Sequence, residues 1–501
     1  MSAGSEGERY LRTLQVAGLA PATHWSIRPF SSSAIARIAP RDSLHPWSAE
    51  YHSHLESRLW VRPVAPELGA IFNSTFPYGM NDGPVWAGRG FTVTASAGVE
   101  GAIGPLDFVI APQFFRAQNA AFPLAPTGYG GPLAFADPQR PTTIDLPQRF
   151  GDAAYQRLDA GQSSVSLNLF RLTVGASTAN EVWGPAVESP FLLGNNAAGF
   201  AHLFAGTDGP ISAGPVTFGV RVIAGRLDQS DYSSTLYAGR RRSLAGIVAT
   251  VGIRQLPGLE VGAGRLFENV YPDSGAGLRD ILRPLFENFL KVNVAEQQSP
   301  GSSRSTENQI ASAFARWLLP DAGVELYGEL GREDHSYDTR DLILEPDHDF
   351  SYMVGLQRVW RRSGGDLLAV RGELLNTEIS HLNLVRAQTP PYVHTPITQG
   401  HTQLGQLLGA PGGFGGGTTV VAVDWVNAGG RRSITWRRVM REPILNTTDP
   451  RDVIQAVTAD WVIFRPRIDL KPEATAVYNV NRAGSSSVLN LRLALSGFVH
   501  W

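Results

Sequence analysis

The stretch SSSVLNLRLALSGFVHW, residues 485–501, decides the fold. Its side chains alternate between apolar and polar, which gives a β-strand one apolar face and one polar face. An aromatic end residue after such alternation resembles the signal that outer-membrane barrel-assembly machinery reads. The alternative is an ordinary last strand that ends in Trp by chance. The apolar face, interrupted only at Gly497, comprises Leu489, Leu491, Leu493, Leu495, Val499 and Trp501.

The same period of two recurs in four earlier segments, at residues 91–99, 216–222, 324–330 and 368–374. A soluble β-sandwich also alternates, with its apolar face turned inward. Several of these strands run for about 10 residues, however, whereas strands of globular domains are nearer 5 or 6 residues long. The strand length therefore favours strands that cross a membrane.

Short and long connections also alternate along the chain. Tight turns are predicted at 256–258, 320–323, 363–365 and 428–430, and long polar loops near 271–306, 334–348 and 379–417. Short turns at one rim and long loops at the other are typical of outer-membrane barrels, whereas a sandwich has no reason to sort its loops. We therefore predict an all-β fold, a transmembrane antiparallel β-barrel.

The number of strands and the domain boundary follow from the same pattern. The hairpins from Arg89 to Trp501 give about 16 strands, and an early strand near 53–73 raises the number to about 18, which we prefer. Before them, Leu11, Leu14, Val16 and Leu19 have roughly helical spacing, and Gly18 followed by Pro21 ends the run. We expect an N-terminal helical periplasmic segment at 1–50 and an outer-membrane barrel with long loops at 51–501.

Composition supports a membrane protein and excludes several classes of function. The chain has 43 basic and 45 acidic residues, a net charge of −2, which argues against nucleic acid as a partner. Charged residues make up 18% of the chain, below the ~25% usual in soluble domains. With no cysteine, a disulfide scaffold and a cysteine nucleophile are excluded. No apolar run reaches the ~20 residues of a spanning helix, so the chain must cross a membrane as strands.

The first residues, MSAGSEGERYLRTL, contain neither the basic region nor the apolar region of a signal peptide. An outer-membrane protein must be exported. We therefore expect that a signal peptide was trimmed and Met1 added, or that the start was misassigned; the alternative is a protein that is not exported.

Three segments, in this order, carry a resemblance to a known family. They are NDGPVWAGRG at 81–90, EVWGP at 181–185 with LLGNNA at 192–197, and GHTQLGQLLG at 400–409. The sequence resembles the Wzi family of capsule-assembly outer-membrane proteins over nearly the whole chain, most specifically in its WGP…LxxNNA part. The resemblance implies an 18-strand barrel with a periplasmic helical bundle, which helps to attach or organise capsular polysaccharide without known catalysis. The sequence departs from the family pattern at Pro185-Ala186-Val187.

These motifs also contain residue types suited to sugar binding. Trp86 and Trp183 offer flat apolar faces on which a sugar ring could stack, and Arg89, Asn195 and Asn196 supply hydrogen-bond donors and acceptors. We name these five residues as candidate saccharide ligands. The structural alternative, which we weigh more heavily, is that Trp-Gly-Pro forms a tight turn and the Asn pair caps backbone groups inside the lumen.

The sequence offers no convincing catalytic or metal site, and we predict no cofactor and no enzyme activity. His52 and His54 share a face of a strand, but no third ligand is evident. Asp347-His348-Asp349 lacks the spaced ligands of a calcium loop, and the GGFGGG run at 412–417 lacks the Lys and Ser/Thr of a phosphate-binding loop. The glycine-rich run is interpreted as a flexible loop.

Charged residues in the strands are expected to face the lumen, since Lys or Arg on the lipid face near the midplane would cost about 2–4 kcal/mol each. Their mixed signs predict a hydrated, hydrogen-bonded interior without strong ion preference. These residues are Arg221, Glu325, Glu329, Arg371, Glu373 and Arg492.

The leading hypothesis is a non-enzymatic protein of the cell outer membrane that binds, anchors or organises capsular or other surface polysaccharide. Outer-membrane lipid and, during biogenesis, the barrel-assembly machinery are its further expected partners. The alternatives are a passive porin-like channel for small solutes, which needs an open lumen, and a barrel enzyme acting on lipid or glycan, which lacks a visible catalytic constellation.

Overall fold

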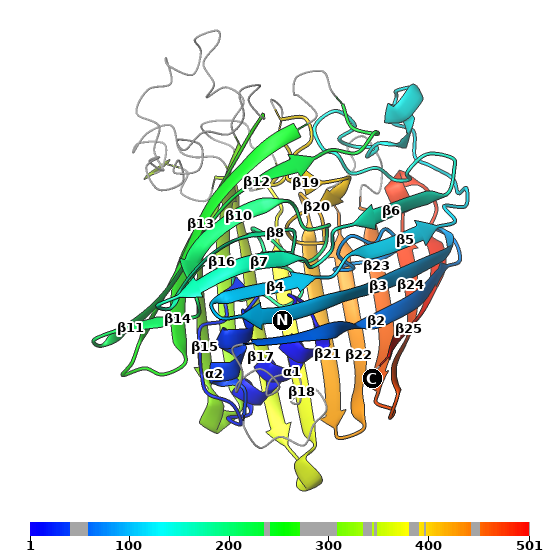
Figure 1. Cartoon of the computed structure of the whole chain (residues 1–501). Coiled ribbons are helices and arrows are strands. Elements are labelled where there is room, and N and C mark those ends of the chain that lie inside the picture. The colour runs from blue at the N-terminus through cyan, green and yellow to red at the C-terminus, as the bar shows by residue number, and fades with distance from the viewer. Residues whose placement is uncertain are drawn as a thin grey trace.

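The computed structural model describes residues 1–40, 59–234, 241–270, 308–333, 343–344, 348–379, 390–394, 397–441 and 451–499. These residues form a closed antiparallel barrel of 18 strands, which confirms the predicted fold class (Figure 1). Three strands are interrupted, and each then has two labels: β4 (Leu106–Ile110) with β5 (Gln113–Ala117), β6 (Tyr155–Asp159) with β7 (Ser164–Leu169), and β10 (His202–Thr207) with β11 (Ile211–Ala213).

The other fifteen strands are continuous, and most of them have 10 to 15 residues, the length needed to cross a bilayer at a tilt. They are β2 (Leu59–Asn73), β3 (Gly90–Ile103), β8 (Leu172–Ser177), β12 (Val216–Asp228), β13 (Arg241–Ile253), β14 (Leu259–Val270), β15 (Asn308–Leu319), β16 (Val324–Glu333), β17 (Phe350–Arg361), β18 (Leu367–Asn376), β21 (Gly417–Asn427), β22 (Gly430–Met440), β23 (Val453–Ile463), β24 (Ile468–Val480) and β25 (Val488–Val499).

The C-terminal strand closes the barrel. β25 pairs with β24 on one side and with β2 on the other, where Leu495 lies opposite Ala70. Its alternate leucines, Leu489 to Leu495, are 44–64% exposed on the outer surface, while Arg492 of the polar face is 5% exposed in the interior. An outward apolar face around a closed sheet is the surface that lipid requires. The chain is thus an outer-membrane β-barrel. Trp501 lies outside the described residues.

The connections sort by length as predicted. Tight turns join β13 to β14, β15 to β16, β17 to β18 and β21 to β22. Gly323 ends the second of these turns at φ +63°, where a Cβ would lie 2.3 Å from the carbonyl oxygen of Val359, so only glycine fits. The long connections gather at the opposite rim, which is the cell-surface rim in barrels of this kind. The predicted loop at 271–306 and most of the one at 334–348 lie outside the described residues.

The N-terminal segment forms a plug inside the end of the barrel that carries the tight turns (Figure 1). Its helices are α1 (Glu6–Val16) and α2 (Ser32–Ile38), and the Ser5 side chain caps α1 by accepting from the Glu8 amide. Leu11 and Leu14 pack on wall residues that include Leu318 and Val359. The predicted boundary at residue 50 falls within 41–58, outside the described residues. No helix in the described part of the chain is long and apolar enough to cross a membrane.

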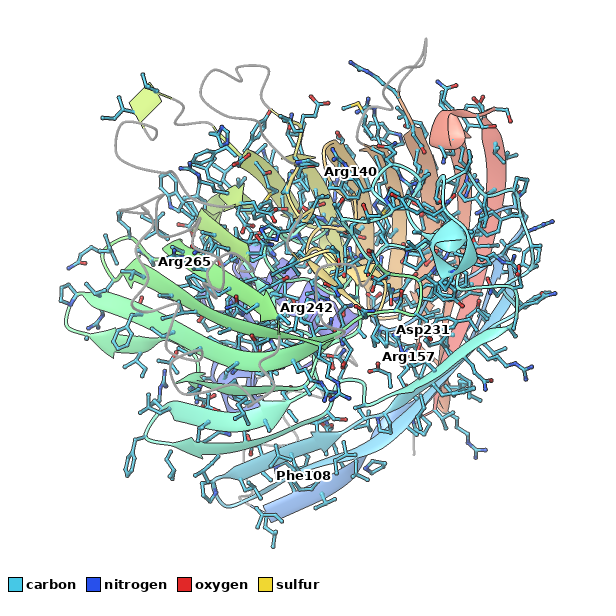
Figure 2. The ribbon with its side chains drawn as sticks, turned by 90° about the horizontal axis from the view of Figure 1, so that it is seen from above. Phe108, Arg140, Arg157, Asp231, Arg242 and Arg265 are labelled. Carbon is cyan, nitrogen blue, oxygen red and sulfur yellow. The ribbon has the colours of Figure 1, made fainter. Side chains whose placement is uncertain are left out.

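Two inward-folded segments of the chain, 178–201 and the described residues 390–394 and 397–414, fill much of the lumen above the plug. Their apolar residues form one core with inward side chains of the wall, including Trp183, Phe191, Tyr392, Leu266 and Phe314. Two small sheets stiffen them, β1 (Ile27–Arg28) with β9 (Val182–Trp183), and β19 (Thr402–Gln403) with β20 (Gln406–Leu407). Seen from the long-loop end, chain and side chains crowd the interior, and Phe108 lies on the outer wall (Figure 2).

The strand charges face the lumen as predicted. Each of the six is at least nine-tenths buried, which on a barrel with an exposed apolar outer face means that it points inward: Arg221, Glu325, Glu329, Arg371, Glu373 and Arg492.

Candidate functional site

A cavity of about 230 Å³ lies at the cell-surface end of the lumen, where the long connections meet. The loop between β2 and β3 forms one side, and the segments 137–139, 146–148 and 405–414 form others. Ends of β22, β23 and β24 complete the lining. We refer to it as the loop cavity. The loop cavity thus lies at the cell-surface end, above the packed core that the inward-folded segments form with the wall.

Trp86 presents the main aromatic surface of the loop cavity. The ring is half-buried and makes T-shaped contacts with Phe150 and Tyr155 at centroid distances of 5.0 and 6.0 Å. Gly88 makes this position possible, since a Cβ there would lie 2.6 Å from Cζ3 of Trp86. A fixed and partly open indole offers an apolar face for a sugar ring at little entropic cost.

Buried oxygen atoms with spare hydrogen-bonding capacity line the same cavity. Oδ1 of Asp452 and Oδ1 of Asn479 belong to side chains that are each 1% exposed, and neither atom has a hydrogen-bond partner among the described residues. Oε1 of Gln406 is likewise buried and has no hydrogen-bond partner among the described residues. A buried acceptor without a partner costs about 1–3 kcal/mol, a cost that a ligand hydroxyl would remove. Several such acceptors beside an indole suit a polyhydroxylated ligand.

The loop cavity also contains cations. Burial and the neighbouring Arg441 lower the pKa of Arg482 to about 10, so its guanidinium remains charged at neutral pH. It lies 5.0 Å from the ring centre of Phe76 and 5.2 Å from that of Phe122, stacked between two aromatic faces. Arg441 forms an ion pair with the other carboxylate oxygen of Asp452 at 3.8 Å. The cavity therefore offers both donors and acceptors to a ligand.

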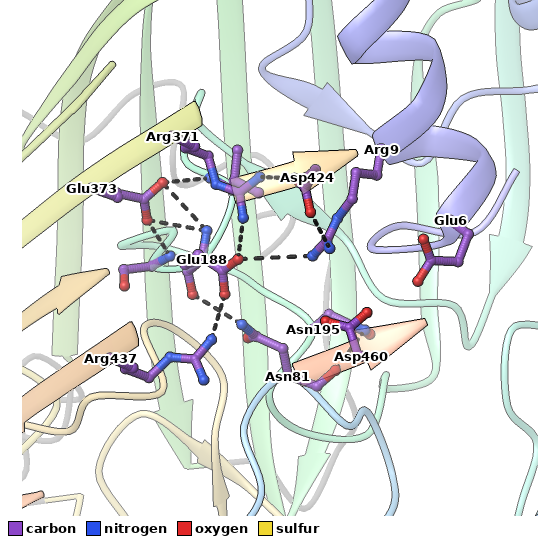
Figure 3. A network of polar contacts seen from close by, with 12 residues as sticks. Glu6, Arg9, Asn81, Glu188, Asn195, Arg371, Glu373, Asp424, Arg437 and Asp460 are labelled. Atoms are coloured by element: carbon purple, nitrogen blue, oxygen red, sulfur yellow. Dashed lines mark hydrogen bonds and ion pairs between the residues drawn. The ribbon is translucent and has the colours of Figure 1, made fainter. Parts of the chain in front are cut away.

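Below the loop cavity lies a network of buried ion pairs centred on Glu188 (Figure 3). The carboxylate of Glu188 contacts Arg371 at 2.6 Å, Arg437 at 2.8 Å and Arg9 at 3.8 Å. Burial alone would raise the pKa of Glu188, but Arg437, Arg371 and Arg9 together outweigh it and lower the pKa to about 2. Glu188 is therefore ionised at physiological pH.

Asp82 lies between the loop cavity and this network. Its carboxylate pairs with Arg492 at 3.2 Å. Burial raises the pKa of Asp82 above its ordinary value in spite of the nearby Arg492. The adjacent turn needs left-handed backbone at Asn81 (φ +57°) and Gly83 (φ +59°), residue types that adopt it readily. The NDGP sequence thus positions both Asp82 and Trp86.

The structure brings two of the five candidate ligands into the loop cavity, Trp86 and Asn196. Asn195 lines a second cavity of about 210 Å³ beneath it. The amide groups of the Asn pair hydrogen-bond to backbone groups, from Asn195 Nδ2 to the Asn81 oxygen at 3.2 Å and from Asn196 Nδ2 to the Leu407 oxygen at 3.1 Å. These contacts match the structural interpretation of the pair, as caps inside the lumen.

The other two candidates lie elsewhere. Trp183 is fully buried in the core of the lumen, and its Nε1 donates to Glu181 at 3.1 Å, so neither ring face is open to a sugar. Gly184 follows it at φ +95°, as the tight-turn alternative requires. Arg89 donates to the backbone oxygens of Ser74 and Ala121 beside the first long loop and does not line the loop cavity.

Asp452, Asn479 and Arg482 were not singled out from the sequence. A signal for Asn479 was present, because the alternation of β24 places it on the polar, inward face next to the outward Tyr478. Gln406 lies inside the 400–409 motif. Asp452 and Arg482 belong to loops, in which side-chain direction follows no periodic pattern.

No metal-binding group of three or more His, Asp or Glu residues occurs among the described residues. His52, His54 and Asp347 lie outside them. Part of the glycine-rich run, Gly412 to Phe414, lines the loop cavity.

No family model and no curated protein matches the sequence. Among solved structures, the fold is similar to that of Wzi from Escherichia coli, described as an outer-membrane protein involved in group 1 capsule assembly and a carbohydrate-binding β-barrel. The match has a TM-score of 0.66 and 14% identity, and it covers 99% of this chain and 98% of Wzi. The fold is thus Wzi-like over its whole length, as the sequence motifs indicated.

Two porin-like barrels match less well. OpdQ from Pseudomonas aeruginosa has a TM-score of 0.41 and 10% identity, with 88% of this chain and 98% of OpdQ covered. OccAB2 from Acinetobacter baumannii has a TM-score of 0.42 and 9% identity, with 86% and 96% covered.

Proposed function

We propose that this protein is a non-enzymatic outer-membrane barrel that binds a capsular or other surface polysaccharide in the loop cavity. One observation carries the proposal: a partly exposed indole, Trp86, shares a cavity at the cell-surface end of the lumen with the unpaired buried oxygens of Asp452 and Asn479. The description of Wzi as a carbohydrate-binding barrel supports the same ligand class. In this scheme the polysaccharide is held at the surface and undergoes no chemical change.

The packed lumen argues against the alternative of a passive channel. The plug and the inward-folded segments together place apolar cores at two levels of the barrel, one around Leu11 and one around Phe191. A solute would have to pass both, as well as the ion pairs around Glu188. We therefore favour binding over passage.

The binding test uses folded protein on an array of purified bacterial surface polysaccharides. We expect saturable binding to at least one of them, and Trp86→Ala should weaken it about 10-fold, since a lost stacking surface is worth ~1–1.5 kcal/mol. Asn479→Leu should weaken it about 5-fold through loss of one acceptor. Tyr129→Ala is the matched control, because Tyr129 is a 49% exposed loop aromatic outside the cavity.

Each variant is first checked for heat-modifiable migration on a denaturing gel, which reports a folded barrel. If folded Trp86→Ala protein binds as tightly as the Tyr129→Ala control, the polysaccharide does not bind in the loop cavity. The absence of binding to every polysaccharide on the array would count against the ligand class itself.

A further inference from the structure

The barrel wall has a notch in its upper half. β6 pairs only with β5 among the described residues, and the end of β12, Arg226–Asp228, pairs only with β13. Among the described strands, only the short β7, β8 and β10 lie between them. Toward the cell-surface end, the pairing of these strands ends at Ser164, Ser177 and His202. Above that line, no described strand completes the wall between β6 and β12.

A groove of about 620 Å³ lies at the floor of the notch. Its lining combines outward residues of the wall, such as Val165 and Leu203, with residues whose side chains point inward, such as His202 and Leu244. His202 and Leu244 are only 4% and 1% exposed, and Phe200 fills the inner side of the wall beside Gly225. The groove therefore lies on the lipid-facing side of the wall, over these short strands.

The outer lining of the groove is apolar and made of small residues between large ones. Ile110, Val165 and Leu203 are 51, 46 and 60% exposed, so they continue the lipid-facing surface of the barrel. Ala176 and Ala224 lie opposite Leu203 on the two neighbouring strands and leave the hollow between these larger side chains. Its volume lies within the roughly 300–1,000 Å³ typical of ligand sites.

Cations stand at the rim nearest the cell-surface end. Arg226 lines the groove, and it pairs with Asp228 at 3.2 Å, while Arg241 lies 3.9 Å from the same carboxylate. The two arginine side chains are 43 and 64% exposed, and one carboxylate between them leaves a net charge of +1. A net positive charge at the rim of an apolar groove on the lipid-facing surface suits an anionic headgroup.

We propose that the notch binds one acyl chain of an anionic phospholipid of the surrounding membrane, with the negatively charged headgroup held by Arg226 and Arg241. The chain lies against Val165 and Leu203 in the groove. Lipid at this position covers the part of the wall above which the segment 178–201 turns inward.

The cysteine-free chain makes a site-specific test possible. A bimane fluorophore is attached to Val174→Cys at the edge of the groove, and in a second protein to Val457→Cys. Val457 is the matched control, an outward valine opposite Trp436 on an uninterrupted part of the wall. Both proteins are reconstituted in phosphatidylcholine vesicles that contain a small fraction of phosphatidylglycerol with a nitroxide on its acyl chain.

We expect the nitroxide lipid to quench the label at 174 severalfold more than the label at 457. The excess should fall to the control level with Arg226→Gln, and also with Ala224→Phe, which fills the groove. Nitroxide phosphatidylcholine, whose phosphate is balanced by its own cation, should quench both labels alike. Equal quenching of the two labels by nitroxide phosphatidylglycerol would overturn the site, and an equal excess with phosphatidylcholine would overturn the preference for a net negative headgroup. No saccharide is present, so neither result depends on the proposed function.

Discussion

Glu188 shows how a single buried carboxylate balances several positive charges inside this lumen. It lies on an inward-folded segment and neutralises arginines from three elements, Arg9 of α1, Arg371 of β18 and Arg437 of β22. Its backbone amide also donates to Glu373 at 3.0 Å. Buried charges are tolerated only when each has partners. The loss of this carboxylate would take from Arg437 its ion pair at 2.8 Å and leave Arg9 and Arg371 with the more distant Asp424.

Glu188→Gln is therefore expected to destabilise the folded barrel by about 3–5 kcal/mol, the cost of breaking a buried ion pair from one side. The measurement is urea unfolding in detergent micelles, followed by tryptophan fluorescence. Glu100→Gln is the control, because the pair of Glu100 with Arg62 is partly exposed and should lose no more than ~1 kcal/mol. Equal losses of unfolding free energy for the two variants would contradict the central role of Glu188 in the network of ion pairs.

The same carboxylate predicts a dependence of stability on pH. Its pKa is about 2 in the folded protein, against roughly 4.3 in an unfolded chain. A depressed folded pKa means that the stabilisation is complete above the unfolded value and is lost as the pH falls toward 2. We expect up to about 3 kcal/mol to disappear between pH 5 and pH 2. Glu188→Gln should flatten that part of the pH profile, and an unchanged profile would rule out this origin.

For single residues, the sequence could predict which way a strand side chain points but not which residues it contacts. Alternation within β18 placed Arg371 and Glu373 in the lumen, as the structure has them. Their partner Glu188 lies more than 180 residues away on a segment without period. The same limit explains Trp183, whose environment includes Gly246 and Leu266 of distant strands. Its aromatic character was visible in the sequence, but its burial was not.

At the scale of elements, helix α1 is fixed to the wall by buried ion pairs as well as by apolar packing. Arg12 donates to Glu325 of β16 at 3.0 Å, and Arg316 of β15 contacts the same carboxylate. Glu325 is completely buried, so these two arginines depend on it. The plug thus shares a charged anchor with the barrel.

Glu325→Gln should loosen the plug without abolishing the barrel, because the strand pairing remains. We expect trypsin to cut the variant at Arg9 or Arg12 within the N-terminal segment, where the unchanged protein is protected. Cleavage is read by mass spectrometry of the released peptides. Glu100→Gln serves again as the control and should stay protected. If the two variants are cut at equal rates, the Glu325 anchor does not hold the plug.

Elements with a strong period were predictable, and elements without one were not. The tight turns and the strands from β12 to β25 follow the alternation and the glycine positions. The sequence did not reveal the interruptions between β4 and β5 or between β6 and β7, where residues 111–112 and 160–163 leave the ladder apart from one bridge between Ala111 and Gly161. The second break shortens β7, one of the strands beneath the notch. A local break of that size has no signature in composition or period.

At the scale of the whole molecule, the barrel is closed by β25 and filled from both ends. The plug occupies the end with the tight turns, and the inward-folded segments occupy the end with the long loops. In the described part of the chain, the loop cavity at that end offers a polar surface to a hydrophilic ligand. This arrangement fits a protein that holds a polymer at the cell surface better than one that conducts solutes.

Conductance of the reconstituted protein in a planar bilayer tests this account most directly, because binding and passage require opposite states of the lumen. We expect that the unchanged protein, shown to be inserted by its heat-modifiable migration after recovery, gives no steady open-channel steps. Glu325→Gln, with a loosened plug, should give more frequent transient openings. Steady, long-lived conductance steps from the unchanged protein would contradict the filled barrel and favour a channel.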